Sequence, residues 1–279
     1  MKGLWKRVLV AILGIPAILG LTYLGGPYFL LFLLVISAMG LWEFYALFKK
    51  NEVYPYRVLG IFIGLSFLLL VFLENWEILY IFMVVSLGAI LIMVLSPQKG
   101  VASLNAVFTI AGIFYTPFFL SAILKVRLAF DAWFLAPPQE NWGGIYLIIL
   151  WASIWICDTA AYFGGSYLGR HKLAPTISPK KTVEGAVTGL LFGLLTFVLL
   201  GKWWLPELPP TLFWWSGIIV GLLGQLGDLV ESRFKRDAAV KDSSTILPGH
   251  GGFLDRFDSF TYVSPFIFLL LYIFQHSRM

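Results

Sequence analysis

The chain has 279 residues, of which 59% are hydrophobic and only 13% are charged, and its formal net charge is +5. Soluble domains are about half apolar and about a quarter charged, so this composition excludes an ordinary soluble enzyme. Repeated apolar runs indicate an all-α fold, a polytopic transmembrane helical bundle. In such a protein the positive charge mostly reflects orientation, so we expect no nucleic-acid partner. The single cysteine, Cys157, excludes an internal disulfide and a cysteine-based zinc site.

About nine apolar runs follow one another along the chain, and we interpret each as a membrane span. The first follows three basic residues, as a signal peptide would, but it is long, contains Pro16 and lacks a small-x-small cleavage pattern. We therefore expect it to be retained. The predicted spans cover about residues 8–24, 28–48, 58–73, 78–95, 104–124, 145–163, 183–200, 212–230 and 260–274.

The basic residues predict the orientation of these spans. If the loops are numbered alternately, all of the 20 lysines and arginines except Lys125, Arg127, Lys202 and Arg278 fall on the side of the N-terminus. Because cytoplasmic loops carry the excess of lysine and arginine, the N-terminus is predicted to be cytoplasmic. The expected location is the cell (inner) membrane.

The polar residues divide the chain into two predicted regions. Residues 1–142, with spans one to five, form a nearly featureless membrane bundle whose side chains are expected to pack and to contact lipid. Glu43 is the exception, and it lies close enough to the cytoplasmic end of its span to snorkel. Residues 143–279, with spans six to nine and their cytoplasmic loops, form the predicted catalytic region.

Acidic residues from four spans are predicted to lie at one depth, near the cytoplasmic face. Buried charges in membranes are costly and usually face a partner or a cavity. A single acid at the interface is equally well explained by a pairing lysine, but a set at a common depth favours a site. The candidates are Asp158, Glu184, Asp228, Glu231, Asp255 and Asp258.

The spacing of these acids suits a divalent cation. Asp228 and Glu231 are three residues apart, as are Asp255 and Asp258, so each pair shares a helix face. Carboxylate oxygens are ligands that Mg²⁺ prefers, together with water and substrate phosphates. Two such pairs could hold Mg²⁺ and a second cation, one on each side of a phosphoryl group.

Basic residues and a helix start predict a phosphate site beside these acids. Ser178-Pro179-Lys180-Lys181-Thr182 has a helix-capping residue followed by proline, which indicates that a helix begins there. A helix N-terminus offers free N–H groups and a positive dipole to an anion. We therefore expect Ser178, Lys180, Lys181 and Thr182 to bind substrate.

The charged stretch before the last span adds further candidates. Gly251 and Gly252 form a turn whose backbone can approach a ligand, although such turns also serve only as connections. His250 could contact a proton or a phosphate, or be a structural histidine. Arg256, between Asp255 and Asp258, could bind a phosphate with two hydrogen bonds or pair with a neighbouring acid. From the residues alone, the chain is predicted to be a membrane enzyme that handles polyphosphate with a divalent cation.

Motifs in the C-terminal half make the prediction specific. Ser232-Arg-Phe-Lys-Arg, Lys241-Asp242 and Leu247-Pro-Gly-His-Gly-Gly-Phe-Leu-Asp-Arg-Phe-Asp258 resemble the signature of the phosphatidate cytidylyltransferases. Asp158-Thr-Ala-Ala-Tyr-Phe-Gly-Gly and Lys172-Leu-Ala-Pro-Thr-Ile-Ser-Pro-Lys-Lys-Thr-Val-Glu-Gly185 also resemble that family, with Ala160 where glycine is usual. The resemblance implies further substrate contacts at Lys172, Lys235, Arg236 and Lys241.

The resemblance implies that CTP and phosphatidic acid react to CDP-diacylglycerol and pyrophosphate, with Mg²⁺ required. The lipid phosphate supplies the nucleophile, so no protein nucleophile is needed. Catalytic roles are expected for Asp228, Asp255, Asp258, Arg256 and His250. A CTP-dependent polyprenol kinase, which would release CDP, and a transporter are the alternatives; a transporter is disfavoured because the acids gather on one side. The sequence leaves the oligomeric state open, with a homodimer as one alternative.

Overall fold

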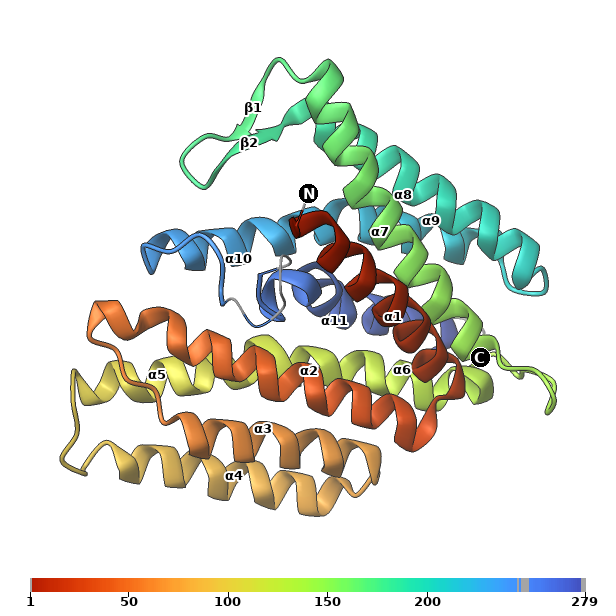
Figure 1. Cartoon of the computed structure of the whole chain (residues 1–279). Helices are drawn as coiled ribbons and strands as arrows, with labels where there is room; N and C mark the ends of the chain where they lie inside the picture. The colour runs from red at the N-terminus through yellow and green to blue at the C-terminus, as the bar shows by residue number, and fades with distance from the viewer. Residues whose placement is uncertain (1, 245, 247–250, 277–279) are drawn as a thin grey trace. The chain divides into compact units, whose positions relative to one another are not determined.

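The computed structural model describes residues 2–244, 246 and 251–276, and this part of the chain is almost entirely helical (Figure 1). The predicted all-α class is therefore confirmed. The helices are α1 (Lys2–Leu24), α2 (Gly26–Leu47), α3 (Arg57–Phe72), α4 (Trp76–Met93), α5 (Ala102–Ile113), α6 (Phe119–Trp133), α7 (Trp142–Leu168), α8 (Val183–Trp204), α9 (Pro210–Ile219), α10 (Gln225–Asp237) and α11 (Leu254–His276). Phe48–Asn51 forms a 3₁₀ turn, and the π-helical turns Phe114–Phe118 and Val220–Gly224 join α5 to α6 and α9 to α10.

Seven helical stretches in the described part of the chain are long and apolar enough to cross a membrane. They are Gly26–Leu47, Trp76–Met93, Ala102–Trp133, Trp142–Leu168, Val183–Trp204, Pro210–Asp237 and Leu254–His276. The two other predicted spans fall on shorter apolar helical stretches, which are Val10–Leu24 within α1 and Arg57–Phe72, the whole of α3. The chain is thus a polytopic helical membrane protein, while the number of spans and the side of the N-terminus stay predictions.

Several helices extend further than the apolar runs that predict them. The last predicted span, 260–274, lies within a helix that already begins at Leu254, and the run 212–230 lies within continuous helix from Pro210 to Asp237. Hydropathy misses these ends because they are charged, although arginine, lysine and glutamate are good helix formers. As a consequence, Glu231 and Asp255, which lie outside the predicted runs, have positions fixed by helices.

The predicted helix start at Ser178 is wrong. Lys172–Ala174 and Ser178–Thr182 form an antiparallel hairpin, β1 and β2, in which Lys172 lies opposite Thr182. Helix α8 begins only at Val183, and Thr182 is its cap, because the Thr182 hydroxyl accepts a hydrogen bond of 3.2 Å from the Gly185 amide. Pro179 fits an edge strand as well as a helix start, so the local sequence did not distinguish the two.

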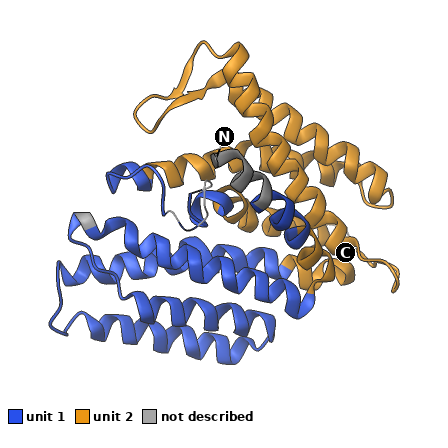
Figure 2. Cartoon of the chain, viewed as in Figure 1, with its two compact units in different colours: residues 1–18, 26–125, 234–257 blue, residues 19–25, 126–233, 258–279 orange. Residues whose placement is uncertain are grey.

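The chain divides into two compact units that interleave in sequence (Figure 2). Unit 1 comprises residues 1–18, 26–125 and 234–257. In it, α3 packs against α2, α4 and α5. The ring of Tyr45 is buried where Gly60 and Gly112 leave room for it, and its hydroxyl donates to the carbonyl of Thr109 at 2.8 Å.

Unit 2 comprises residues 19–25, 126–233 and 258–279. Its central helix is α8, which packs along α7 and α9. Glycines four residues apart, at 185, 189 and 193 of α8, allow this approach: a Cβ at Gly189 would lie 2.9 Å from Ala161 Cβ and 3.0 Å from the Cys157 carbonyl oxygen. Small residues at such spacing are typical of close helix pairs in membranes. The β1–β2 hairpin connects α7 to α8 in the same unit. The predicted functional division at residue 142 stays a prediction.

Candidate active site

Three carboxylates of unit 2 form the cluster that we call the acid cluster: Asp228, Glu231 and Asp258. An oxygen of each lies within 4.8 Å of an oxygen of the others. Asp228 and Glu231 are one turn apart on α10, so the predicted shared face is confirmed. Glu231 is completely buried and Asp258 is 8% exposed, whereas the side chain of Asp228 is 38% exposed. The cluster therefore has a buried side and an open side.

Close packing between α10 and α11 within unit 2 positions these acids. A Cβ at Gly227 would lie 2.6 Å from Tyr262 Cβ and 3.2 Å from the Asp258 carbonyl oxygen, so only glycine allows this approach. The Ser259 hydroxyl donates to the Gly224 carbonyl at 3.0 Å, at the end of the π-helical turn. Such turns leave carbonyls without their usual helical donor and are frequent at functional sites.

Lys181 supplies a positive charge to the acid cluster. Its ammonium lies 2.6 Å from Oδ2 of Asp228, and the Ser232 hydroxyl donates to Oδ1 of the same carboxylate at 3.3 Å. Lys181 is in strand β2, where successive side chains point to opposite faces. Its neighbour Lys180 is exposed. The two lysines that the sequence treats as one pair therefore have different environments.

Glu184 and Asp158 lie outside the acid cluster in the described structure. The carboxylate of Glu184 accepts hydrogen bonds from the amides of Arg170 at 3.0 Å and His171 at 3.2 Å, and lies 2.6 Å from His171 Nδ1. Glu184 thus joins the start of the hairpin segment to the first turn of α8. Asp158 follows the buried Cys157 on α7. Metal binding by either acid stays a prediction.

Asp255 lies in unit 1, in a second polar centre. Its Oδ1 accepts a hydrogen bond of 2.6 Å from the ammonium of Lys235, and both side chains are nearly buried. Its Oδ2 accepts from the amides of Gly252 at 2.8 Å and Ser243 at 3.1 Å, and the Ser243 hydroxyl oxygen lies 3.1 Å from it. Asp255 and Lys235, which the sequence assigns to metal and substrate, form an ion pair here.

The turn before α11 contains two glycines that pack closely against the residues of this polar centre. Gly251 has φ +84°, a conformation that L side chains rarely adopt. A Cβ at Gly252 would lie 2.5 Å from a carboxylate oxygen of Glu43. Packing thus explains both glycines, and contact with substrate stays a prediction. His250, a predicted catalytic residue, lies outside the described residues.

The remaining predicted substrate residues are near the surface. Lys172, Lys241 and Arg256 are exposed, and the Arg236 guanidinium donates to the Val240 carbonyl at 3.0 Å. Ser178 is half-buried in strand β2. Substrate binding by these residues stays a prediction.

Sequence reasoning left three polar residues of unit 1 out of the candidate site: Glu43, Ser243 and Ser244. Glu43 is only 1% exposed, and the hydroxyls of Ser243 and Ser244 donate to its carboxylate at 3.0 Å and 2.5 Å. The available signal was an acid in an otherwise apolar span. The prediction that Glu43 snorkels to the interface is wrong.

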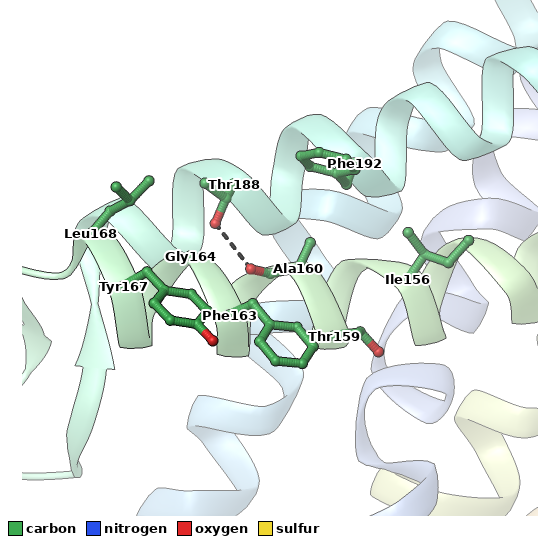
Figure 3. Close-up of a pocket in the computed structure, with 9 residues that line it drawn as sticks. All are labelled: Ile156, Thr159, Ala160, Phe163, Gly164, Tyr167, Leu168, Thr188 and Phe192. Atoms are coloured by element: carbon green, nitrogen blue, oxygen red, sulfur yellow. Dashed lines mark hydrogen bonds between the residues drawn. The ribbon is translucent and has the colours of Figure 1, made fainter.

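An apolar pocket of about 560 Å³ lies between α7 and α8 of unit 2 (Figure 3). Ile156, Phe163, Tyr167 and Phe192 are among its lining residues, and the Thr188 hydroxyl donates to the Ala160 carbonyl at 3.2 Å beside it. None of the predicted site residues that the structure describes lines this pocket. It suits hydrocarbon rather than a nucleotide.

The donor set of the acid cluster fits a hard divalent cation. Three carboxylates supply oxygen ligands, and the partly open Asp228 leaves room for water or a phosphate. The described residues of the cluster offer no sulfur or imidazole ligand. The arrangement can therefore hold a cation and present it to a phosphorylated substrate.

Comparisons with known proteins identify the family. Residues 5–274 match the cytidylyltransferase family. A protein of Synechocystis sp. named phosphatidate cytidylyltransferase is 33% identical over 94% of this chain and 94% of its own length. A protein of the same name from Staphylococcus haemolyticus is 34% identical over 95% of this chain and 98% of its own length. Another, from Bacillus subtilis, is 41% identical over 57% of this chain and 59% of its own length. The resemblance seen in the motifs is confirmed, and the chain belongs to the cytidylyltransferase family.

Proposed function

We propose that the chain transfers the cytidylyl group of CTP to phosphatidic acid, forming CDP-diacylglycerol and pyrophosphate in the membrane. The observation that carries this proposal is the family match, which extends from residue 5 to residue 274 and so includes the acid cluster and the hairpin. The relatives that match along nearly their whole length bear the name of this activity.

The reaction needs no nucleophile from the protein. An oxygen of the lipid phosphate attacks the α-phosphorus of CTP, and the bond from this phosphorus to the bridging oxygen of the β-phosphate breaks. Pyrophosphate leaves with the electron pair of that bond. Catalysis of phosphoryl transfer consists largely of positioning and of electrostatic stabilisation, so charged residues are the expected contributors.

Asp228, Glu231 and Asp258 are proposed to hold Mg²⁺. When bound, such an ion neutralises charge that develops on phosphate oxygens. The carboxylates themselves provide the negative oxygens that fix the ion at the meeting of α10 and α11 in unit 2. The burial of Glu231 and Asp258 supports this role, because buried acids in membrane proteins usually face a partner or a cavity.

Lys181 is proposed to act with the acid cluster on the substrate phosphates. Its ammonium is already 2.6 Å from Asp228, so a phosphate that approaches the cluster meets a fixed positive charge. Lysine is a common phosphate ligand because its three N–H donors can follow the oxygens. The exposed Lys172 and Lys180 on the same hairpin are proposed to attract the anionic substrates from a distance.

The active site is proposed to face the cytoplasm of the inner membrane. CTP is charged and soluble, so it arrives from the side that carries most of the lysines and arginines. Phosphatidic acid stays in the bilayer, because transferring each CH₂ to water costs about 0.8 kcal/mol. We therefore propose a site that is open both to the cytoplasm and to the inner leaflet.

Labelled CTP tests the proposal against its main alternative. The purified chain in nanodiscs containing phosphatidic acid is incubated with CTP labelled at the α- or at the γ-phosphorus. Cytidylyl transfer places the α-label in the lipid and the γ-label in pyrophosphate. A lipid kinase would place the γ-label in the lipid and release CDP, and that result would overturn the proposal.

A further inference from the structure

We propose that Glu43, on the second helix, is a positioning residue that holds the start of α11 and, through it, the carboxylate of Asp255. This inference uses the proposed reaction as one readout, but it also has a readout that is independent of activity. All the residues involved, Glu43, 234–244 and 251–257, belong to unit 1.

The burial of Glu43 is the first observation. It lies on α2 with 1% of its surface exposed, in a stretch of the helix where Leu41 and Phe44 are also buried. A carboxylate at such a place is costly unless hydrogen bonds compensate for its lost water. The hydrogen-bond donors around Glu43 therefore decide whether its carboxylate is stable there.

Four donors satisfy the two oxygens of Glu43. Oε1 accepts from the Ser244 hydroxyl at 2.5 Å and from the Phe253 amide at 3.0 Å. Oε2 accepts from the Ser243 hydroxyl at 3.0 Å and from the Leu254 amide at 2.8 Å. Each oxygen thus has one hydroxyl donor and one backbone donor.

The backbone donors are the free amides at the start of α11. Leu254 is the first residue of α11 and Phe253 precedes it, so neither amide has an acceptor within the helix. A negative charge at a helix N-terminus is favourable because of the helix dipole. Glu43 therefore caps α11 from a helix that lies about two hundred residues earlier in the chain.

The hydroxyl of Ser243 connects Glu43 to Asp255. The Ser243 hydroxyl lies 3.0 Å from Glu43 and 3.1 Å from Oδ2 of Asp255, so it lies between the two carboxylates. Oδ2 of Asp255 also accepts from the Gly252 amide at 2.8 Å, and Oδ1 from Lys235 at 2.6 Å. A change at Glu43 will thus displace the partners that fix Asp255.

The consequence is that the first half of the chain contributes to the geometry of the signature motif. Asp255 belongs to the Leu-Asp-Arg-Phe-Asp sequence, and Ser243 and Ser244 precede that sequence by about ten residues. Displacing a reacting group by about 1 Å can reduce the rate about 100-fold, even when the altered residue does not touch substrate.

The test compares Glu43→Gln with Ser37→Ala in full-length protein in nanodiscs. Glutamine keeps the shape of the side chain but replaces one acceptor oxygen with an NH₂ group. This NH₂ group then lies next to a hydroxyl and a backbone amide that both need an acceptor. Ser37 is the matched control, because it is also fully buried on α2 and makes no hydrogen bond to residues 243, 244, 246 and 251–254, the described part of the facing segment. Hydrogen exchange of the peptide 251–257 and the kinetic constants for CTP are measured for both.

We expect Glu43→Gln to speed amide exchange in 251–257 by about tenfold, because a hydrogen bond to a charged acceptor is lost. We expect kcat per folded molecule to fall about 100-fold, with a smaller change in KM for CTP. A purely structural role would instead lower the amount of folded protein and leave kcat unchanged. Ser37→Ala should match the wild type in both measurements.

Ser244→Ala keeps the proposal testable if Glu43→Gln does not fold, since it removes only one of the four donors. It should raise the exchange in 251–257 and lower kcat in the same direction by smaller factors. Wild-type exchange in either folded variant, or wild-type kcat with altered exchange, would overturn the proposal. If the wild-type chain itself made no CDP-diacylglycerol, the proposed function would fail, and the exchange data would still decide whether Glu43 holds α11.

Discussion

At the scale of single residues, carboxylates of the same kind have different partners. Asp228, Glu231 and Asp258 face one another, whereas Glu184 accepts hydrogen bonds from the hairpin backbone and Glu43 accepts from the start of α11. Mutual repulsion makes the acid cluster unfavourable without a compensating charge. The convergence of three carboxylates is the reason why this cluster is the candidate cation site.

If the acid cluster holds Mg²⁺ as proposed, Lys181 competes with the ion for Asp228, and its replacement has a measurable effect. In Lys181→Gln the charge of Asp228 loses its partner at 2.6 Å. The Mg²⁺ concentration for half-maximal activity is expected to fall about tenfold, equivalent to ~1.4 kcal/mol. Activity is titrated with Mg²⁺ at saturating substrates.

Lys180→Gln is the matched control for that titration. The two lysines are adjacent, carry the same charge and differ in the face of β2 from which they extend. Lys180→Gln should leave the half-saturating Mg²⁺ concentration unchanged. An equal shift in both variants would mean that only the net charge of the hairpin matters, and would contradict the specific pairing.

At the scale of elements, the sequence predicted the helices well and their ends poorly. Apolar runs locate helices because the backbone N–H and C=O groups of a membrane span must form hydrogen bonds within the span itself. Helix ends that carry charge, such as Leu254 to Ser259 of α11, have no hydropathy signal. Ser178-Pro179 suited a helix start and an edge strand equally, and the strand was decided by pairing with Lys172–Ala174 across the turn.

Part of the candidate site was accessible from the sequence, and part was not. The i, i+3 spacing is enough to predict that Asp228 and Glu231 share one face, because helix geometry fixes that relation. The hydrogen bonds of Glu43 join residues about two hundred positions apart, and local sequence patterns such as hydropathy and helix spacing do not predict such contacts. The motif glycines were assigned to substrate, whereas packing against Asp255 and Glu43 also requires them.

The contact between α7 and α8 should be sensitive to one added methyl group. Gly189→Ala places a Cβ at 2.9 Å from Ala161 Cβ and 3.0 Å from the Cys157 carbonyl oxygen, closer than normal packing allows. Overpacking of this kind costs about 1–3 kcal/mol. Thermal unfolding in detergent, followed by the loss of monodisperse protein, measures the change.

Gly88→Ala provides the control, because Gly88 is a helical glycine with no atom within 4 Å of the added Cβ. This variant should unfold at the wild-type temperature or slightly above it, since alanine favours helices by about 0.5–1 kcal/mol over glycine. Equal destabilisation by both substitutions would show that the α7–α8 approach does not depend on Gly189.

At the scale of the whole molecule, two units interleave along the chain, and each contains one of the polar centres. Unit 2 holds the acid cluster and unit 1 holds Asp255 with Lys235 and Glu43. Both α10 and α11 contribute residues to each unit. The linear division at residue 142 does not describe this organisation of contacts, although it remains a prediction about function.

Cysteine labelling tests the predicted orientation. Because Cys157 is buried, the native chain should react slowly with a membrane-impermeant maleimide. In right-side-out vesicles, Glu207→Cys, after the end of α8, should react, whereas Lys172→Cys, in the hairpin before α8, should react only after permeabilisation. The reverse pattern would place the hairpin outside the cytoplasm and contradict the orientation.

The central claim is that the chain transfers the cytidylyl group with the help of the acid cluster, and pyrophosphate release by Asp228→Asn tests it most directly. The variant is compared with the wild type and with Glu207→Gln, an exposed acid beyond the end of α8, in nanodiscs that contain phosphatidic acid, Mg²⁺ and CTP. Loss of one electrostatic contributor typically lowers kcat by about 100-fold or more. If the acid cluster assists cytidylyl transfer, the wild type and Glu207→Gln should each form one pyrophosphate for every CDP-diacylglycerol. Folded Asp228→Asn should form both products at a rate that is lower by at least about 100-fold. Wild-type turnover by Asp228→Asn would contradict it.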